Sequence, residues 1–202
     1  MARQTNTPAI IIILALTVAA LALVLYASLG RGTAAARKPN PSSLQPTTLS
    51  AGNGAFATYL NRDVPQDYYA VDAPASWTPE TTGVAGEYAF RSGDATVTVK
   101  LTDVPDNSNL VLYVLSQVEP QLRSTVQGYQ EISHANMTVN GAEAFRLTYR
   151  STTNATSAVT TLVFIMGSDQ AALISASAPE TEYGSFKAAF DRVIESFSWR
   201  NQ

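Results

Sequence analysis

The chain has 202 residues, of which 46% are hydrophobic and 14% are charged, and its formal net charge at neutral pH is -3. This mildly acidic balance, without a basic stripe, argues against nucleic-acid binding. Cysteine is absent, which excludes disulfides, thiolate zinc sites, a catalytic thiol and lipid attachment through cysteine. The length leaves room for one domain of ordinary size beside shorter segments.

The first predicted element is the stretch from Pro8 to Leu29, PAIIIILALTVAALALVLYASL, which contains no charged residue. A bilayer core about 30 Å thick is crossed by roughly 20 helical residues, so we predict one transmembrane anchor over residues 8–30. A cleaved signal peptide is the alternative, but its apolar region usually spans only about 7–15 residues. The apolar side chains that carry the anchor prediction include Ile10, Ile13, Leu14, Leu21 and Leu25.

The residues on either side of this anchor bear on its orientation in the membrane. Arg3 lies in the short N-terminal tail, residues 1–7, whereas Arg31, Arg37 and Lys38 follow the anchor. Counting these charges slightly favours a cytoplasmic domain. The short tail and the Ser/Thr/Pro-rich linker, however, resemble exported bacterial proteins. We therefore expect a single-pass protein of the cell membrane with its soluble domain on the periplasmic side.

Residues 31–66 are predicted to form a linker, because their composition shifts to small and polar residues and prolines interrupt regular structure. Near its end, Phe56, Tyr59 and Leu60 suggest a short helix that docks on the domain. A group of aromatic residues in this region has two possible interpretations. It either seals the linker onto the core or forms a patch that binds a partner. Its members are Tyr59, Tyr68, Tyr69 and Trp77.

Residues 67–202 form the predicted soluble domain. Apolar residues alternate around 69–71, 88–90 and 97–101, which predicts strands, and the turn at 92–94 joins the last two into a hairpin. An apolar residue then recurs every fourth position from Leu110 to Val126, which predicts a helix. Pro120 lies inside this pattern and should kink the helix or start a second one, since it cannot donate a backbone hydrogen bond.

Three further strands and a final helix complete the domain. Asn140-Gly141 is a strong signal for a hairpin turn. The stretch from Ala158 to Met166 is nearly continuously apolar, as in a central strand covered on both faces. After Pro179, aromatic and aliphatic residues follow helical spacing up to Phe197. This order predicts an α+β fold, an antiparallel sheet with helices on its faces.

No catalytic or ligand-binding motif stands out. His134 is the single histidine, at the mouth of a predicted strand, and a lone histidine is more often structural or solvent-exposed. The acids Asp103, Asp106 and Glu119 have no metal-ligand spacing and are expected to solvate a loop and a helix face. Neither a nucleophile elbow nor a glycine-rich phosphate loop is present. We therefore predict a non-enzymatic protein without a metal, cofactor or identifiable small-molecule substrate.

Two stretches resemble the PsbP-like family, which comprises extrinsic subunits of photosystem II and related bacterial envelope proteins. The stretch Tyr69–Pro74 with Trp77 resembles the opening strand and turn of that family, and Ser175–Trp199 resembles its closing strand and aromatic helix. The resemblance implies an αβα sandwich over about 67–200. The predicted anchor and proline-rich linker replace the basic extension of plant-type members.

The resemblance also implies an accessory role beside a membrane complex. The expected function is that of a single-pass accessory subunit of a bacterial photosynthetic or respiratory complex, which stabilises assembly or the docking of an electron carrier. Its expected partners are the lipid bilayer and other subunits of that complex. The alternative is a free membrane-anchored envelope protein that binds a small ligand or a nascent protein.

Overall fold

A computed structural model describes residues 56–61, 69–82, 84, 86–105, 109–168 and 170–200. The predicted anchor, with Ile10, Ile13, Leu14, Leu21 and Leu25, lies outside the described residues, as do Tyr68 and most of the predicted linker. Among the helices that the structure describes, none has the length and apolar character needed to cross a bilayer.

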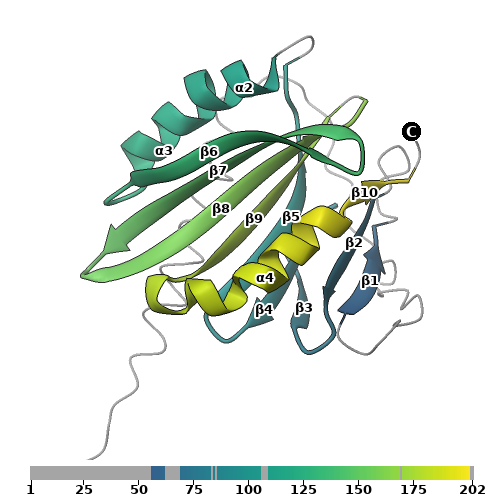
Figure 1. The fold of residues 1–202 in the computed structure, drawn as a ribbon, viewed down its shortest axis with the longest axis horizontal. Coiled ribbons are helices and arrows are strands. Elements are labelled where there is room, and N and C mark those ends of the chain that lie inside the picture. Colours follow the sequence, from purple (N-terminus) through teal and green to yellow (C-terminus); the bar gives the residue numbers. More distant parts are fainter. Residues whose placement is uncertain are drawn as a thin grey trace, which may run out of the picture.

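The centre of the domain is a seven-stranded antiparallel sheet (Figure 1). Two consecutive meanders build this sheet, and the pairing of β5 with β9 joins them, so the strand order is not simply that of the chain. In spatial order the strands are β3 (Thr78–Thr81), β4 (Tyr88–Ser92), β5 (Ala95–Thr102), β9 (Ala171–Pro179), β8 (Thr156–Met166), β7 (Ala142–Thr153) and β6 (Gln130–Val139).

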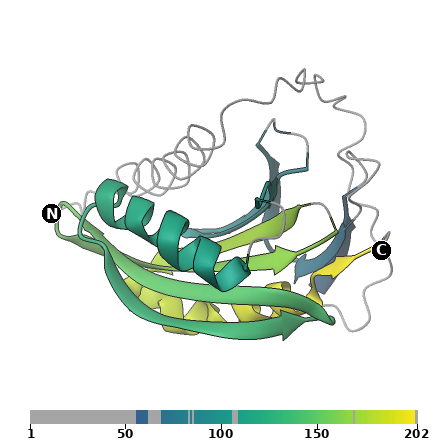
Figure 2. The same cartoon turned by 90° about the horizontal axis from the view of Figure 1, so that it is seen from above.

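Helices cover opposite faces of this sheet (Figure 2). The helix α4 (Glu180–Ser196) packs on one face, whereas α2 (Leu110–Tyr113), the π-helical turn η1 (Val114–Val118) and α3 (Glu119–Thr125) lie on the other. Strand β8 serves both cores, since Val163 and Ile165 point to one and Leu162 and Phe164 to the other. The predicted α+β architecture and the central strand covered on both faces are confirmed.

Pro120, which is expected to kink the helix or start a second one, lies at a change of helix type within a continuous helical stretch. It lies in the first turn of α3, directly after the π-helical turn η1. Because proline has no N–H, it cannot make the usual bond to the preceding helical turn, and the wider turn accommodates this missing bond. The predicted helix is therefore three short segments in succession.

A second, three-stranded sheet consists of β1 (Phe56–Leu60), β2 (Tyr69–Pro74) and β10 (Ser198–Trp199), in the order β1-β2-β10. The short helix expected around Phe56, Tyr59 and Leu60 is therefore wrong. These side chains are spaced as in a helix, but the segment instead forms a strand that pairs with β2, because the backbone donors and acceptors of β2 need hydrogen-bond partners. The Tyr59 ring lies 4.7 Å from that of Phe90, edge to face.

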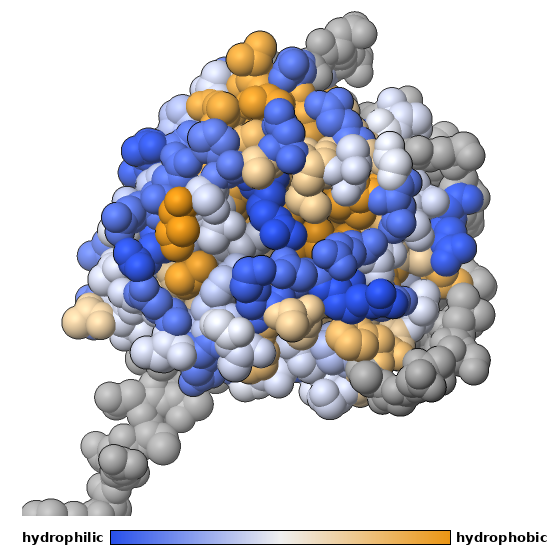
Figure 3. Space-filling model, in the orientation of Figure 1, coloured by the Kyte–Doolittle hydropathy of each residue, from blue (hydrophilic) through white to orange (hydrophobic). Residues whose placement is uncertain are grey.

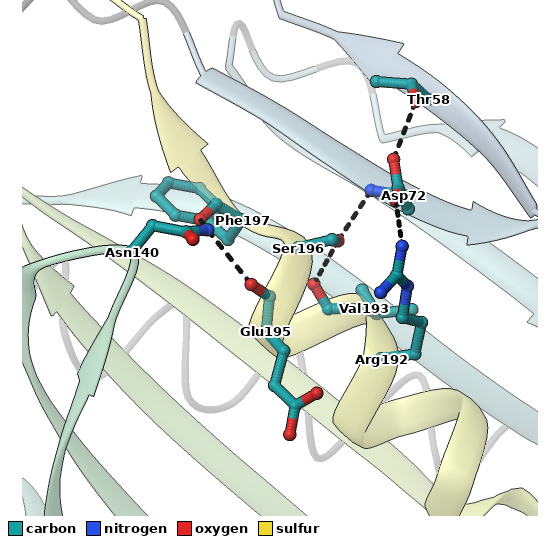
Figure 4. Close-up of polar contacts among 8 residues, drawn as sticks. All are labelled: Thr58, Asp72, Asn140, Arg192, Val193, Glu195, Ser196 and Phe197. Carbon is teal, nitrogen blue, oxygen red and sulfur yellow. Dashed lines mark hydrogen bonds and ion pairs between the residues drawn. The ribbon is translucent and has the colours of Figure 1, made fainter. Parts of the chain in front are cut away.

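The end of α4 is tied to both sheets (Figure 4). Asn140, in the β6–β7 turn, donates from Nδ2 to the carbonyls of Glu195 at 3.0 Å and Phe197 at 2.7 Å. Its φ of 48° and that of Gly141, 87°, fit the predicted tight hairpin. The turn thus also serves as a cap for carbonyls that the helix leaves unpaired.

A second set of contacts joins the same helix to β2 (Figure 4). The N–H of Asp72 donates to Ser196 Oγ at 2.8 Å, and the Asp72 carboxylate accepts bonds from Thr58 at 2.7 Å and Arg192 at 3.2 Å. One aspartate therefore connects β1, β2 and α4. These contacts fix the small sheet against the end of the helix.

Candidate functional site

Strand β6 is an edge strand of the large sheet and pairs only with β7 among the described strands (Figure 1). Most of its side chains are exposed. Ile132 is among them, with 48% of its surface exposed. An edge strand presents backbone N–H and C=O groups that another polypeptide can pair with. The edge formed by β6 and the adjoining α3 is called the β6–α3 surface below.

An irregularity in β6 shapes this surface. Glu131 lies opposite Tyr149 and Ser133 lies opposite Thr148, so Ile132 is an extra residue in the ladder. In a regular strand, residues three apart point to opposite faces. The bulge reverses this alternation and brings Glu131 and His134 to the same face, next to α3. It also leaves Ile132 exposed at the edge.

A network of charged side chains spans α3 and β6. His134 Nδ1 and Glu131 Oε1 form a hydrogen bond of 2.7 Å. Arg123 donates from Nε to Glu119 at 2.9 Å, and its terminal nitrogen lies 3.6 Å from the other oxygen of Glu131. Glu119 is buried, whereas Arg123 and His134 are exposed. The network therefore begins inside the α3–β6 contact and ends at the surface.

Aromatic rings hold Arg123 and His134 in place. The His134 ring stacks on Phe145 with ring centres 5.7 Å apart. The Arg123 guanidinium lies 5.3 Å from the centre of the Tyr129 ring, a cation–π distance. Tyr129 in turn packs against Tyr149, with ring centres 5.2 Å apart. Ring contacts of this kind restrict exposed charged side chains to one position, whereas without such contacts they would adopt several.

The protonation states follow from these contacts. The hydrogen bond with His134, aided by Glu119 and Arg123, holds the pKa of Glu131 below its usual value. Burial, followed by the nearby carboxylates of Glu119 and Glu131, raises the pKa of Tyr129. Burial also raises the pKa of Tyr149 to about 12. Both phenols are therefore neutral at physiological pH, and Glu131 is a carboxylate.

Two carboxylates of this network, those of Glu119 and Glu131, face one guanidinium, that of Arg123. The Tyr129 hydroxyl lies near Glu119 and Glu131. It is shielded from solvent and has no hydrogen-bond partner among the described residues. Chemically, the arrangement can receive a cation from outside at the partly exposed carboxylate of Glu131. Within the described ranges, no three His, Asp or Glu side chains are grouped to hold a metal ion.

Of the aromatic residues considered as a partner patch, those that the structure describes are buried or partly buried. Tyr69 is 1% exposed and Trp77 is 6% exposed, because both belong to the core beneath α4. Tyr59 is partly buried against the same core, and Tyr68 lies outside the described residues. The prediction of a partner patch is therefore wrong for Tyr69 and Trp77, because large aromatic rings gain more by filling the space between helix and sheet than by facing water.

The candidate acids and the histidine are placed differently. His134 lies within β6 and not at its mouth, and Glu119 is buried in contact with Arg123 instead of solvating a helix face. Asp103 is exposed, and Asp106 lies outside the described residues. The pairing of Glu119 with Arg123 is readable from their i,i+4 spacing on a helix. The pairing of Glu131 with His134 is not, because it depends on the bulge.

A different apolar feature is visible in the space-filling view, where hydrophobic side chains gather at the top of the face, over α2 (Figure 3). Leu112, in α2, has 66% of its surface exposed. Smaller hydrophobic patches lie elsewhere on this face among hydrophilic side chains (Figure 3). Single exposed leucines are common on soluble domains, so this feature by itself indicates no partner.

Comparison with known proteins places the fold. No protein-family model and no curated protein matches the chain. Among solved structures, cyanobacterial PsbP (CyanoP) from Synechocystis sp. PCC 6803 is 18% identical with a TM-score of 0.55, over 77% of this chain and 100% of that one.

Two further solved structures are similar. The mycobacterial protein LpqN, described as involved in cell envelope biogenesis of Mycobacterium tuberculosis, is 13% identical with a TM-score of 0.54, over 71% of this chain and 91% of that one. PA94 from Pseudomonas aeruginosa, described as a putative regulator, is 13% identical with a TM-score of 0.52, over 74% of this chain and all of that one. At these identities the likeness concerns the fold alone, and the fold is PsbP-like.

Proposed function

We propose that this chain is a membrane-anchored, non-enzymatic accessory protein that binds a subunit of a bacterial membrane complex through its β6–α3 surface. The anchor is the apolar segment at residues 8–30, and the linker at residues 31–66 gives the domain its reach. The complex belongs to photosynthetic or respiratory electron transport. Binding stabilises the assembled complex or the docking of a soluble carrier.

The observation that carries this proposal is the exposed edge of β6. Its outer side has no partner strand among those described, and the side chains along it are mostly exposed. The adjoining network is held in fixed positions by ring stacking and ion pairs. A preorganised surface binds a partner with less loss of conformational freedom than a mobile one. The edge therefore combines available backbone groups with ordered side chains.

Two further observations support the membrane setting. The apolar stretch Pro8–Leu29 has the length and composition of a membrane span. The fold is similar to that of CyanoP. The family that two stretches of this sequence resemble includes extrinsic subunits of a membrane complex. Likeness in fold does not establish function, so this support is by analogy.

The likeness to LpqN favours a second candidate, an envelope protein whose domain binds a small ligand or a nascent protein while it remains free in the membrane. The two candidates differ in what accompanies the chain. An accessory subunit travels with its complex in constant proportion, whereas a free envelope protein does not.

Extraction of native membranes with mild detergents, followed by capture through a tag placed after Gln202, separates these candidates. We expect a stoichiometric set of redox or pigment-binding subunits in the eluate, identified by mass spectrometry. The control is the same capture from cells that carry the tag on an unrelated single-pass protein. Recovery of the chain alone across several mild detergents would refute the accessory role and favour the free envelope protein.

A further inference from the structure

We infer that the partner of the β6–α3 surface contributes a basic side chain, which pairs with Glu131 at the bulge of β6. This inference rests on the proposed function and adds the chemistry of the partner to it. The partner is a polypeptide segment that lies along β6 with a lysine or arginine near Glu131.

Charge balance is the first reason. The groups that face Glu131 are Glu119 and Arg123 on α3, His134 on β6, Tyr129 before it and Tyr149 on β7. Both phenols are neutral, as their raised pKa values require. The carboxylates of Glu119 and Glu131 share one guanidinium, that of Arg123. An added cation would complete the balance, and no described side chain other than Arg123 and His134 forms an ion pair with either carboxylate.

Access is the second reason. The Glu131 side chain retains 25% exposure, compared with 10% for Glu119, so an external cation reaches Glu131 first. A half-buried carboxylate attracts a cation more strongly than a fully solvated one, because less water screens the pair. Ile132 lies next to it at the edge with nearly half of its surface exposed and offers an apolar contact beside the charge.

Backbone geometry is the third reason. A bulge bends an edge strand and interrupts regular pairing, which protects the edge against indiscriminate addition of strands. A partner that binds this edge must therefore be complementary to its side chains as well as to its backbone hydrogen-bonding groups. A basic residue positioned at the bulge supplies that match, since complementary charge selects among strands that could otherwise pair.

Site-specific photocrosslinking tests the inference, and the chain suits this method because it has no cysteine of its own. The full-length variant Ile132→Cys, carrying a photoreactive maleimide, is mixed with detergent-solubilised membranes from cells that lack the protein. The matched control is Ala188→Cys, at an exposed position of α4. If Ile132→Cys fails to fold, Asn136→Cys reports on the same exposed strand.

We expect a crosslink to one defined membrane-complex protein from position 132 and not from position 188, with a lysine or arginine close to the linked residue. Adding Glu131→Gln should lower the yield about three- to tenfold, and raising the salt from about 0.05 M to about 0.5 M should lower it in the parent but much less in the Gln variant.

The possible failures are distinguishable. A crosslink at position 132 to a peptide without a basic residue, or a yield that ignores both Glu131→Gln and salt, would overturn the inference and leave the accessory role intact. A crosslink from position 188 alone would place the docking surface elsewhere. If the tagged wild-type chain recovers no complex at all, the proposed function itself is wrong.

Discussion

The cap that Asn140 places on the end of α4 offers a quantitative test of the fold. Asn140 combines two roles, since its amide donates to the carbonyls of Glu195 and Phe197 and its backbone has a φ of 48°. A typical hydrogen bond contributes about 1 kcal/mol net, and the bond to Glu195 is the more exposed of the two. Loss of both bonds should therefore cost about 1–2 kcal/mol of the free energy of unfolding.

The two roles separate with two substitutions. Asn140→Gly removes the hydrogen bonds but tolerates the positive φ, so we expect the loss of about 1–2 kcal/mol. Asn140→Ala removes the bonds and keeps a Cβ in the left-handed region without the polar side chain that eases this conformation in asparagine, so it should cost about 1–2 kcal/mol more than Asn140→Gly. Asn154, in the β7–β8 turn, has a similar φ of 50°. Asn154→Gly is thus a matched control that should leave the stability nearly unchanged.

Urea unfolding of the full chain in mild detergent, followed by tryptophan fluorescence, provides the measurement. The chain has two tryptophans, and Trp199 lies close to the cap, with its ring 5.1 Å from that of Phe197. An Asn140→Gly variant as stable as the wild type would show that the amide does not cap the helix. Equal losses for Asn140→Gly and Asn140→Ala would show that the backbone conformation contributes nothing.

Three further predictions concern other parts of the domain. Phe164→Ala empties a fully buried position under α2 and should lower the free energy of unfolding by about 3–5 kcal/mol, again measured in urea. Gly128→Ala should be destabilising, because Gly128 has a φ of 63° and the added Cβ would lie 2.8 Å from the carbonyl oxygen of Thr152. We expect a lower Tm in a thermal-shift measurement, and an unchanged Tm would contradict the prediction. Glu131 has a folded pKa below its usual value owing to the hydrogen bond with His134. Its ion contacts therefore contribute stability at pH values above its ordinary pKa, and this contribution disappears as the pH falls through the lowered pKa. Between about pH 5 and pH 3, the wild type should lose more stability than Glu131→Gln, and parallel curves for the two would refute the reasoning.

Local pattern accounts for much of what the sequence predicts correctly. Alternating apolar residues locate strands, and the Asn140-Gly141 pair locates a turn, because these signals arise from neighbouring residues along the chain. The nearly continuous apolar run of β8 also implies two covered faces, and both cores are present. Pro120 predicts a helix boundary since its missing N–H acts within one helical turn.

Other features arise only from contacts between distant segments. The strand β1 forms because β2 needs a partner, although its side chains are spaced as in a helix. The pairing of β5 with β9 depends on how the two meanders meet, which no local signal specifies. Tyr69 and Trp77 become core residues because α4 packs over them, and aromatic composition alone does not distinguish a core from a binding patch.

The β6–α3 surface combines both kinds of information. The sequence by itself determines the helical pairing of Glu119 with Arg123, since residues four apart on a helix are neighbours. The tertiary structure alone decides that Glu131 and His134 share a face, because one extra residue at Ile132 reverses the alternation of the strand. The tertiary structure also places this strand at the edge of the sheet beside α3. The charge network forms only because the bulge and this position of the strand occur together.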